Sequence, residues 1–295
     1  MDGLHINPRS VNAVQKIPFL PIGFFKSHQV KTTSFKAETI FESSGTTGTI
    51  NSKHYIRDIA LYKENFTRIF ELFYGNVADW CILGLLPSYL ERDNSSLVMM
   101  VNQLILQSEH SESGFYLNDL KKLHHTLLHN EFLQVPTLLI GVTFALLDFA
   151  EKYPMKLKHT IVMETGGMKG RREEMIREEV HAELIKNLGV KVIHSEYGMT
   201  ELLSQAYSKG NGRFTTPPWM KVLIRDEDDP LCVRSVPDNA RKPATGFVNI
   251  IDMANIYSIA FIGTDDIGRI HQDGSFEILG RGDNSDIRGC SLMAI

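Results

Sequence analysis

The sequence predicts an α/β fold in which a parallel sheet is joined to a smaller β-rich subdomain. Two observations support this prediction. Between His159 and His194, a strand pattern, a glycine pair, a helix pattern and a second strand pattern follow one another, which is typical of a βαβ unit. After Gly212, short apolar runs alternate with turns rich in Asp, Pro and Gly, as in a β-rich subdomain. A chain of 295 residues has room for both parts.

The N-terminal part predicts an extended segment, a helix and a buried strand. Pro18 and Pro21 interrupt the apolar run 17–25, which therefore predicts an extended segment, because proline does not fit a helix interior. The run WCILGLL at 80–86 has the length and apolar character of a buried strand. Residues 57–74 predict a helix, because apolar side chains recur on one face at Ile59, Tyr62, Phe66, Ile69 and Phe73.

The middle of the chain predicts two helices and a core segment before the βαβ unit. Helical patterns cover 95–106 and 117–129. Residues 132–147 carry no charge but are too few to span a bilayer, which takes about 20 residues. This run is therefore interpreted as buried core.

The βαβ unit consists of a strand at 159–164, a helix over 176–188 with apolar residues four apart, and a strand at 190–194. In parallel sheets, ligands bind where loops leave the carboxyl ends of the strands. The pair Gly166–Gly167 and the loop SEYGMTE at 195–201 are therefore expected at the same edge of the sheet.

Composition and charge exclude several classes of protein. The sequence has 31 Lys and Arg against 35 Asp and Glu, and the densest charged segment, 169–183, mixes both signs, so nucleic acid is not expected as a partner. The three cysteines lie far apart, which predicts no metal or redox pair and indicates a reducing, cytoplasmic location. The first ten residues have no apolar stretch typical of a secretory signal, and no membrane span is predicted.

The segment Ser43-Ser44-Gly45-Thr46-Thr47-Gly48-Thr49 is rich in hydroxyl groups and glycine. Glycine lets the backbone turn sharply and present its N–H groups, and the hydroxyls add donors, so the segment is a candidate cradle for phosphate oxygens. It is not a Walker A loop, because the Gly-Lys-Ser/Thr ending is missing. An ordinary Ser/Thr-rich turn is the structural alternative.

Later segments also contain residue types suited to a nucleotide. Tyr197-Gly198-Met199-Thr200-Glu201 offers an aromatic face, a hydroxyl and a carboxylate, and carboxylate oxygen is a ligand that Mg²⁺ prefers. Segments 263–268 and 280–289 carry carboxylates that can accept the hydroxyls of a ribose. A strand-to-helix turn and a pair of Asp/Gly turns explain the same residues structurally.

Taken in order, SSGTTG, YGMTE, TDDIG and GRGDNSDIRG resemble the phosphate loop, the adenine and Mg²⁺ loop, the ribose motif and the hinge of the adenylate-forming superfamily of acyl- and aryl-CoA ligases and luciferases. Longer stretches, among them IPFLPIGFFKSHQVKT and RGDNSDIRGCSLM, resemble the LuxE-type acyl-protein synthetases. The resemblance implies the large N-terminal domain of the adenylate-forming fold over 1–278. It also implies a hinge and short tail over 279–295, without the usual C-terminal domain.

The resemblance also implies which residues would bind ATP. Ser43 to Gly48 would hold the β- and γ-phosphates. Gly166 and Gly167 would approach the adenine, and Tyr197 would stack on it, with Gly198 in the same loop.

The remaining implied roles concern the α-phosphate, the metal and the ribose. Thr200 would contact the α-phosphate and Glu201 would hold Mg²⁺. Asp266 would accept the ribose hydroxyls with support from Arg281, and Asp283 matches the hinge position.

Two departures from the superfamily pattern matter. The Pro-Lys-Gly that usually continues the phosphate loop is missing, which leaves Lys53 as the candidate phosphate ligand. The sequence stops before the segment that guides CoA, so Cys290 is the expected acyl acceptor, because a thiolate is a strong nucleophile and Arg288 favours the anion. A small buried residue is the alternative for Cys290, and Cys81 and Cys232 are interpreted as core.

These features predict an ATP- and Mg²⁺-dependent ligase that converts a long-chain fatty acid to acyl-AMP and transfers it to Cys290. The expected partner is an acyl-reductase or an acyl-carrier protein, and the acyl pocket is expected along 83–86 and 138–147. Two alternatives stay open. One is an adenylating ligase that passes an acyl or aryl group to a carrier protein or a small acceptor, and the other is a non-catalytic nucleotide-binding subunit.

Overall fold

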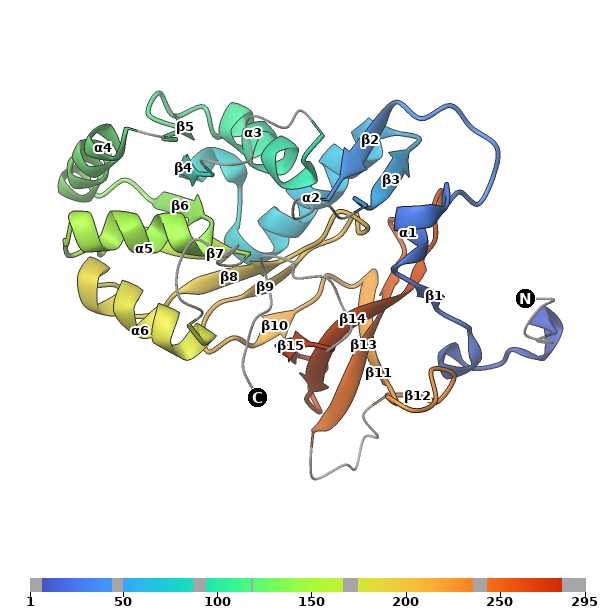
Figure 1. The fold of residues 1–295 in the computed structure, drawn as a ribbon. Helices are drawn as coiled ribbons and strands as arrows, with labels where there is room; N and C mark the ends of the chain where they lie inside the picture. The colour runs from blue at the N-terminus through green and yellow to red at the C-terminus, as the bar shows by residue number, and fades with distance from the viewer. Residues whose placement is uncertain are drawn as a thin grey trace.

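The computed structural model describes residues 7–43, 50–86, 94–117, 119–166, 175–235 and 243–282. Among these residues, thirteen strands form one mixed sheet, and a separate hairpin of β2 and β3 lies beside α2 (Figure 1). The main sheet runs β12-β11-β13-β14-β15-β10-β9-β8-β7-β6-β4-β5, and β1 pairs in parallel with β14. Helices α2 to α6 accompany the parallel half, and antiparallel strands form the other half (Figure 1).

The N-terminal region contains short elements before the first long helix. Helix α2 starts after Asp58, whose carboxylate accepts a hydrogen bond from the backbone N–H of Leu61. The predicted extended segment is partly wrong: α1 forms within it, because it begins after Pro21 and therefore has no proline in its interior. The elements are 3-10 helices Pro8–Ser10, Val14–Lys16 and Val77–Asp79, β1 (Leu20–Pro21), α1 (Phe24–Ser27), β2 (Thr39–Glu42), β3 (Lys53–Ile56), α2 (Ile59–Tyr74), β4 (Cys81–Leu85) and α3 (Ser96–Ser108).

The middle region forms the parallel half of the sheet. Strands β5, β4, β6, β7 and β8 pair in parallel in that order, which confirms the predicted βαβ unit of β7, α6 and β8. The bounds are β5 (Gly114–Phe115), α4 (Leu120–Leu133), β6 (Thr137–Gly141), α5 (Thr143–Lys152), β7 (Thr160–Thr165), α6 (Arg177–Leu188) and β8 (His194–Tyr197).

The second strand of this unit lies further along the chain than predicted. Residues 190–194 were expected to form it, but β8 begins only at His194, which pairs with Met163. The reason lies in the burial pattern, since Val190 and Ile193 are buried whereas Lys191 and Val192 are exposed. That spacing does not alternate with the period of two that a strand requires.

The C-terminal region is the predicted β-rich subdomain. Strands β11, β13, β14 and β15 form an antiparallel meander with bulges in two of its pairings. The strand β15 continues across the domain boundary predicted at 278/279, and that boundary stays a prediction. The bounds are β9 (Ala206–Ser208), β10 (Phe214–Thr215), β11 (Met220–Arg225), β12 (Val233–Arg234), β13 (Ala244–Asp252), β14 (Phe261–Ile270) and β15 (Phe276–Arg281).

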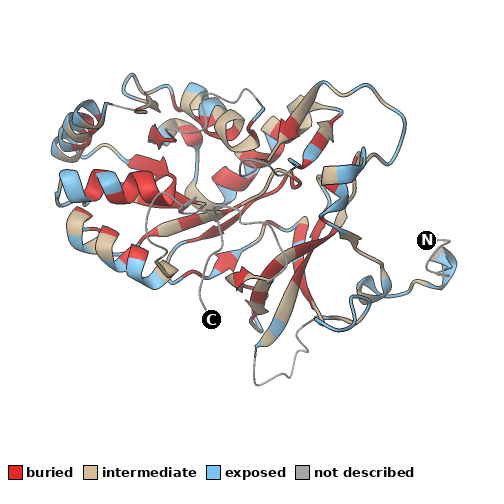
Figure 2. Ribbon diagram, viewed as in Figure 1, coloured by how far each residue is buried: buried red, intermediate tan, exposed pale blue. Residues whose placement is uncertain are grey.

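Two hydrophobic clusters stabilise the two halves (Figure 2). One surrounds β4, β6 and β7, and the other lies on β11 and β13 to β15. The uncharged run 132–147 is core from Thr137 onward, but Phe132, at the end of α4, is 83% exposed. Cys81 is buried as predicted, whereas Cys232 is only half-buried beside Arg234. Among the described residues, no helix combines the length and apolarity needed to cross a membrane.

The bulged strand β14 depends on a glycine. A Cβ atom at Gly268 would lie 2.6 Å from Cγ2 of Val248 and 2.8 Å from the backbone oxygen of Glu277. Gly268→Ala is therefore expected to lower the free energy of unfolding by about 1–3 kcal/mol, measured by urea denaturation. Gly23→Ala is the control, because a Cβ there meets no atom within 4 Å, and its effect should stay within about 0.5 kcal/mol. Equal stability of both variants would contradict this packing.

Candidate functional site: a cavity at the strand ends

A cavity lies where the carboxyl ends of β7 and β8 meet β14 and β15. It brings together five of the predicted site residues, Gly166, Tyr197, Gly198, Asp266 and Arg281, which come from four separate segments of the sequence. This is the edge of the parallel sheet at which ligands were expected. The described lining residues are Ile22, Glu164, Thr165, Gly166, Arg177, Glu196, Tyr197, Gly198, Met199, Phe214, Thr264, Asp266, Ile278 and Arg281.

Asp266 is the centre of a buried polar cluster on one wall. The hydroxyl of Tyr197 donates to Oδ2 of Asp266 at 2.8 Å, and Nε of Arg281 lies 3.3 Å from Oδ1. The register of β14 and β15 sets Asp266 directly opposite Arg281. Both side chains are about nine-tenths buried, so the ion pair is formed away from bulk water. The two residues predicted to bind ribose therefore lie in contact.

An arginine that the sequence analysis did not single out supports this wall. Arg225 donates to the backbone oxygen of Thr264 at 2.6 Å and to Oδ1 of Asn249 at 2.8 Å. The hydroxyl of Thr264 in turn accepts from the backbone N–H of Asp266. Arg225 therefore fixes the bulged stretch of β14 that presents Asp266. It lies at the end of an ordinary strand pattern, and no local signal marks it.

Glu164 is the centre of a second cluster that the sequence analysis missed. Its Oε1 lies 3.5 Å from Nε of Arg177 and 3.7 Å from Nε2 of His181. Burial acts to raise the pKa of Glu164, but the interactions with His181 and Arg177 outweigh it and lower the pKa to about 2. This cluster was missed in the sequence analysis because Arg177 and His181 lie four residues apart on α6. In the sequence alone, such a pair on a charged helix cannot be distinguished from a solvent-exposed face.

Glu196 stands next to this cluster on the neighbouring strand. The hydroxyl of Thr165 donates to Oε2 of Glu196. Burial and the negative charge of Glu164 raise the pKa of Glu196 to about 7. A Cβ atom at Gly198 would overlap Oε1 of Glu196, so a larger residue there would displace this carboxylate. The cavity therefore holds two adjacent carboxyl groups with opposite shifts of pKa.

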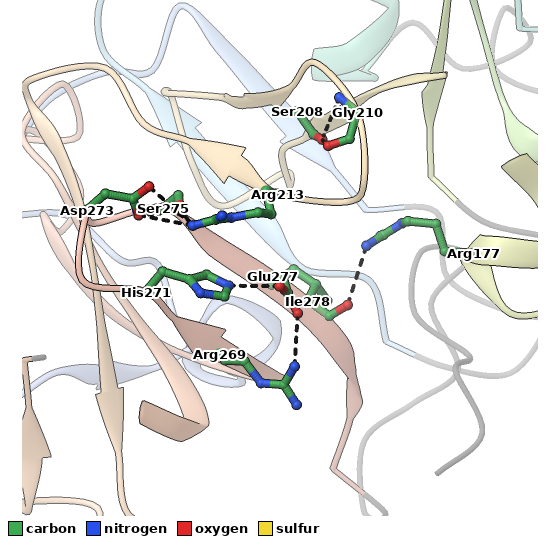
Figure 3. A network of polar contacts seen from close by, with 10 residues as sticks. All are labelled: Arg177, Ser208, Gly210, Arg213, Arg269, His271, Asp273, Ser275, Glu277 and Ile278. Carbon is green, nitrogen blue, oxygen red and sulfur yellow. Dashed lines mark hydrogen bonds and ion pairs between the residues drawn. The ribbon is translucent and has the colours of Figure 1, made fainter. Parts of the chain in front are cut away.

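Arg177 also bridges the two halves of the molecule. It donates to the backbone oxygen of Ile278 on β15, as Figure 3 shows, and its guanidinium lies over the ring of Phe214. Further polar contacts lie around β14, β15 and β10, which are neighbours in the middle of the sheet. Figure 3 shows Arg213 with Asp273 and Ser275, and Glu277 with Arg269 and His271.

Thr200 and Glu201 lie next to the cavity but do not line it. Glu201 is fully buried, and its backbone oxygen accepts from the side-chain amide of Asn255 at 2.8 Å. Among the described residues, no group of three or more His, Cys, Asp or Glu side chains could hold a metal ion by itself. A Mg²⁺ ion that arrives with nucleotide phosphates needs only one or two protein carboxylates, so Glu201 fits that role chemically.

The predicted phosphate loop is described only at its two ends. The hydroxyl of Ser43 accepts from the backbone N–H of Ser52 at 2.9 Å, and the N–H of Ser43 donates to the oxygen of Ser52. These bonds close the base of the loop. Nζ of Lys53 lies 3.6 Å from Oε1 of Glu42. The predicted site residues Ser44, Gly45, Thr46, Thr47, Gly48, Gly167, Asp283 and Cys290 lie outside the described residues.

The acyl pocket was expected along 83–86 and 138–147, but both stretches are buried in the hydrophobic core, and neither contributes to the cavity. The acyl pocket along these residues therefore stays a prediction.

The chain is similar to solved structures of acid–CoA ligases. An ATP-bound MatB from Rhodopseudomonas palustris matches with a TM-score of 0.62 and 16% identity, over 85% of this chain and 50% of the other. A long-chain-fatty-acid–CoA ligase from Archaeoglobus fulgidus matches with a TM-score of 0.57 and 13% identity, over 82% and 51%. The chain shares its fold with these enzymes. No protein-family model and no curated protein sequence matches it.

A third match is the O-succinylbenzoate CoA synthetase of Bacillus subtilis in complex with ATP and magnesium, with a TM-score of 0.56 and 14% identity, over 86% and 53%. The chain thus spans about half the length of the structures it resembles. At these identities the likeness concerns the fold alone. It confirms the α/β domain expected from the resemblance to adenylate-forming enzymes.

Proposed function

We propose that this protein is an adenylating ligase that uses ATP and Mg²⁺ to activate a carboxylic acid as acyl-AMP. The observation that carries the proposal is the cavity in which Gly166, Tyr197, Asp266 and Arg281 meet at the strand ends. Four separate segments of the sequence supply them, and each has the chemistry of a nucleotide contact. An aromatic ring, a ribose-binding carboxylate and its arginine are a minimal set for adenosine.

The chemistry expected of these residues is mostly binding and orientation. The carboxylate of the acid attacks the α-phosphate, the new C–O–P linkage forms, and the bond to pyrophosphate breaks. Thr200 would orient the α-phosphate, and the loop that Ser43 and Ser52 close would hold the leaving phosphates. Glu201 would hold Mg²⁺, which supplies charge neutralisation when it is bound.

The substrate and the acceptor are the finer part of the proposal. The resemblance to LuxE-type enzymes supports a long-chain fatty acid and transfer to Cys290, followed by transfer to a reductase or carrier-protein partner. The carboxyl and hydroxyl groups that Glu164, Thr165 and Glu196 add to the cavity wall support the second candidate, a ligase that passes an acyl or aryl group to a carrier protein or small acceptor.

The test is a pyrophosphate-release screen. We expect ATP- and Mg²⁺-dependent release with at least one member of a series of fatty acids of graded length and aryl acids. Incubation with the labelled acid should then give hydroxylamine-labile label on the protein, and Cys290→Ser should remove it. Label that survives Cys290→Ser would exclude transfer to that cysteine, whereas pyrophosphate release without any label on the protein would favour the second candidate. Tight ATP binding without release for any acid would instead support a non-catalytic subunit.

A further inference from the structure

A buried histidine from outside the cavity holds the loop that carries Thr200 and Glu201. His54 lies on β3, a few residues after the predicted phosphate loop, and only 1% of it is exposed. Its Nδ1–H donates to the backbone oxygen of Thr200 at 2.8 Å, because a carbonyl oxygen is only an acceptor. The rings of Phe25 and His54 pack edge to face, with their centroids 5.5 Å apart.

The other ring nitrogen of His54 contacts a chain of hydrogen-bonded side chains that leads back to the same loop. Nε2 of His54 lies 2.8 Å from Oγ of Ser258, and Ser258 donates to Oδ1 of Asn255. The amide of Asn255 then donates to the backbone oxygen of Glu201. Two consecutive carbonyl groups of the loop, at Thr200 and Glu201, are therefore held by one chain of side chains.

A carboxylate fixes the next residues of the loop. Asp252 accepts from the backbone N–H groups of Leu203 and Ser204 and from the Ser204 hydroxyl, at 2.9, 2.9 and 2.7 Å. Asp252, Ser204, Ser258 and Asn255 are all at least 97% buried. A backbone that is hydrogen-bonded at 200, 201, 203 and 204 has little freedom to change its position.

We propose that His54 is a positioning residue that couples the phosphate loop to the Thr200–Glu201 loop. This inference rests on the proposed function, in which those two residues contact the α-phosphate and Mg²⁺. The ring does not line the cavity, so it acts through the Thr200 carbonyl. His54 lies on β3, the strand that follows the loop expected to hold the leaving phosphates.

The test compares two amide replacements that resemble different halves of the imidazole. The amide nitrogen of His54→Asn occupies the place of Nδ1 and keeps the donor to Thr200, whereas that of His54→Gln occupies the place of Nε2. We expect His54→Ala and His54→Gln to lower kcat of acid-dependent pyrophosphate release by about 10- to 100-fold, with KM for ATP nearly unchanged. His54→Asn should restore most of kcat. His129→Ala, on the exposed face of α4, is the control.

A second readout does not depend on turnover. Mn²⁺ binding to the complex with a non-hydrolysable ATP analogue, followed by electron paramagnetic resonance, should weaken about tenfold in His54→Ala and His54→Gln but not in His54→Asn. Ser258→Ala removes the far partner of the ring and the donor to Asn255 but leaves the hydrogen bond from His54 to Thr200, so it should give a smaller decrease in kcat and in Mn²⁺ affinity. It provides the comparison should His54→Ala fail to fold.

The outcomes separate the inference from the function on which it rests. Unchanged kcat and Mn²⁺ affinity in folded His54→Ala, or in Ser258→Ala if His54→Ala does not fold, would overturn the positioning role. Equal losses in the Asn, Gln and Ala variants, in step with lower thermal stability, would also overturn it. If the unaltered protein neither binds ATP nor releases pyrophosphate with any acid, the proposed function fails, and the inference fails with it.

Discussion

Asp266→Ala is expected to lower the free energy of unfolding by about 3–5 kcal/mol and to abolish measurable ATP binding. The carboxylate faces Arg281 at 3.3 Å, and the arginine side chain is only 8% exposed. Removing one partner of a buried ion pair leaves the other charge buried without a counter-charge. The loss of solvation of that charge is the main reason for the lower free energy of unfolding. The Tyr197 hydroxyl loses its acceptor at the same time.

Asp265→Ala is the matched control for this prediction. Asp265 precedes Asp266 and also lies 3.5 Å from Arg281, but its side chain is 42% exposed. Because the Asp265 carboxylate is solvated and Arg281 keeps its buried partner Asp266, this variant should lose only about 0–1 kcal/mol of stability and should bind ATP. Urea denaturation and calorimetric titration with ATP measure both effects. Loss of ATP binding in both variants, or in neither, would contradict the assignment of ribose recognition to Asp266.

The sequence predicted the parts of the fold that depend on local periodicity. The apolar side chains of 57–74 recur at helical spacing, and α2 covers Ile59–Tyr74. The continuous apolar run 80–86 became β4, with every residue buried. The βαβ unit followed from a strand, a glycine pair and a helix. The second strand was misplaced by several residues, because a buried Val190 and Ile193 resemble strand residues until their spacing is compared with an alternating pattern.

The same distinction separates the site residues that were predicted from the sequence from those that were not. Tyr197, Asp266 and Arg281 were predicted from motifs, and the structure brings them into contact. Glu164 and His54 were not predicted, because their importance comes from partners that are distant in the sequence. His54 contacts residues about 146 and 204 positions later. No spacing rule within a single segment contains such information.

The adjacent carboxyl groups of Glu164 and Glu196 should give the stability of the protein two opposite pH dependences. The pKa of Glu164 is lowered from 4.5 to about 2, so its ionised form stabilises the folded state above about pH 4.5, and this stabilisation is lost as pH falls toward 2. The pKa of Glu196 is raised to about 7. Its neutral form is therefore favoured in the folded state, and stability is lost as pH rises from about 4.5 through 7.

The two carboxyl groups can be separated by amide substitution. The raised pKa of Glu196 corresponds to about 3 kcal/mol in total, most of which falls between pH 5 and 8. Glu196→Gln should therefore gain about 2–3 kcal/mol of stability relative to the unaltered protein as pH rises from 5 to 8. Glu164→Gln should be less stable by about 3 kcal/mol throughout this range, because Arg177 and His181 lose their charged partner. Urea denaturation at pH 5, 6, 7 and 8 measures both differences.

Glu183→Gln provides the control, because Glu183 lies on α6 in a surface pair with Lys186 and has no partner in the cavity among the described residues. Its effect should be within about 0.5 kcal/mol and independent of pH. The comparison is sharp because Glu164 and Glu196 lie on neighbouring parallel strands and differ mainly in their partners: a cationic helix face for one, a hydroxyl and a like charge for the other. Parallel pH profiles for Glu164→Gln and Glu196→Gln would show that burial alone governs both groups and that Arg177 and His181 do not set the charge of this wall.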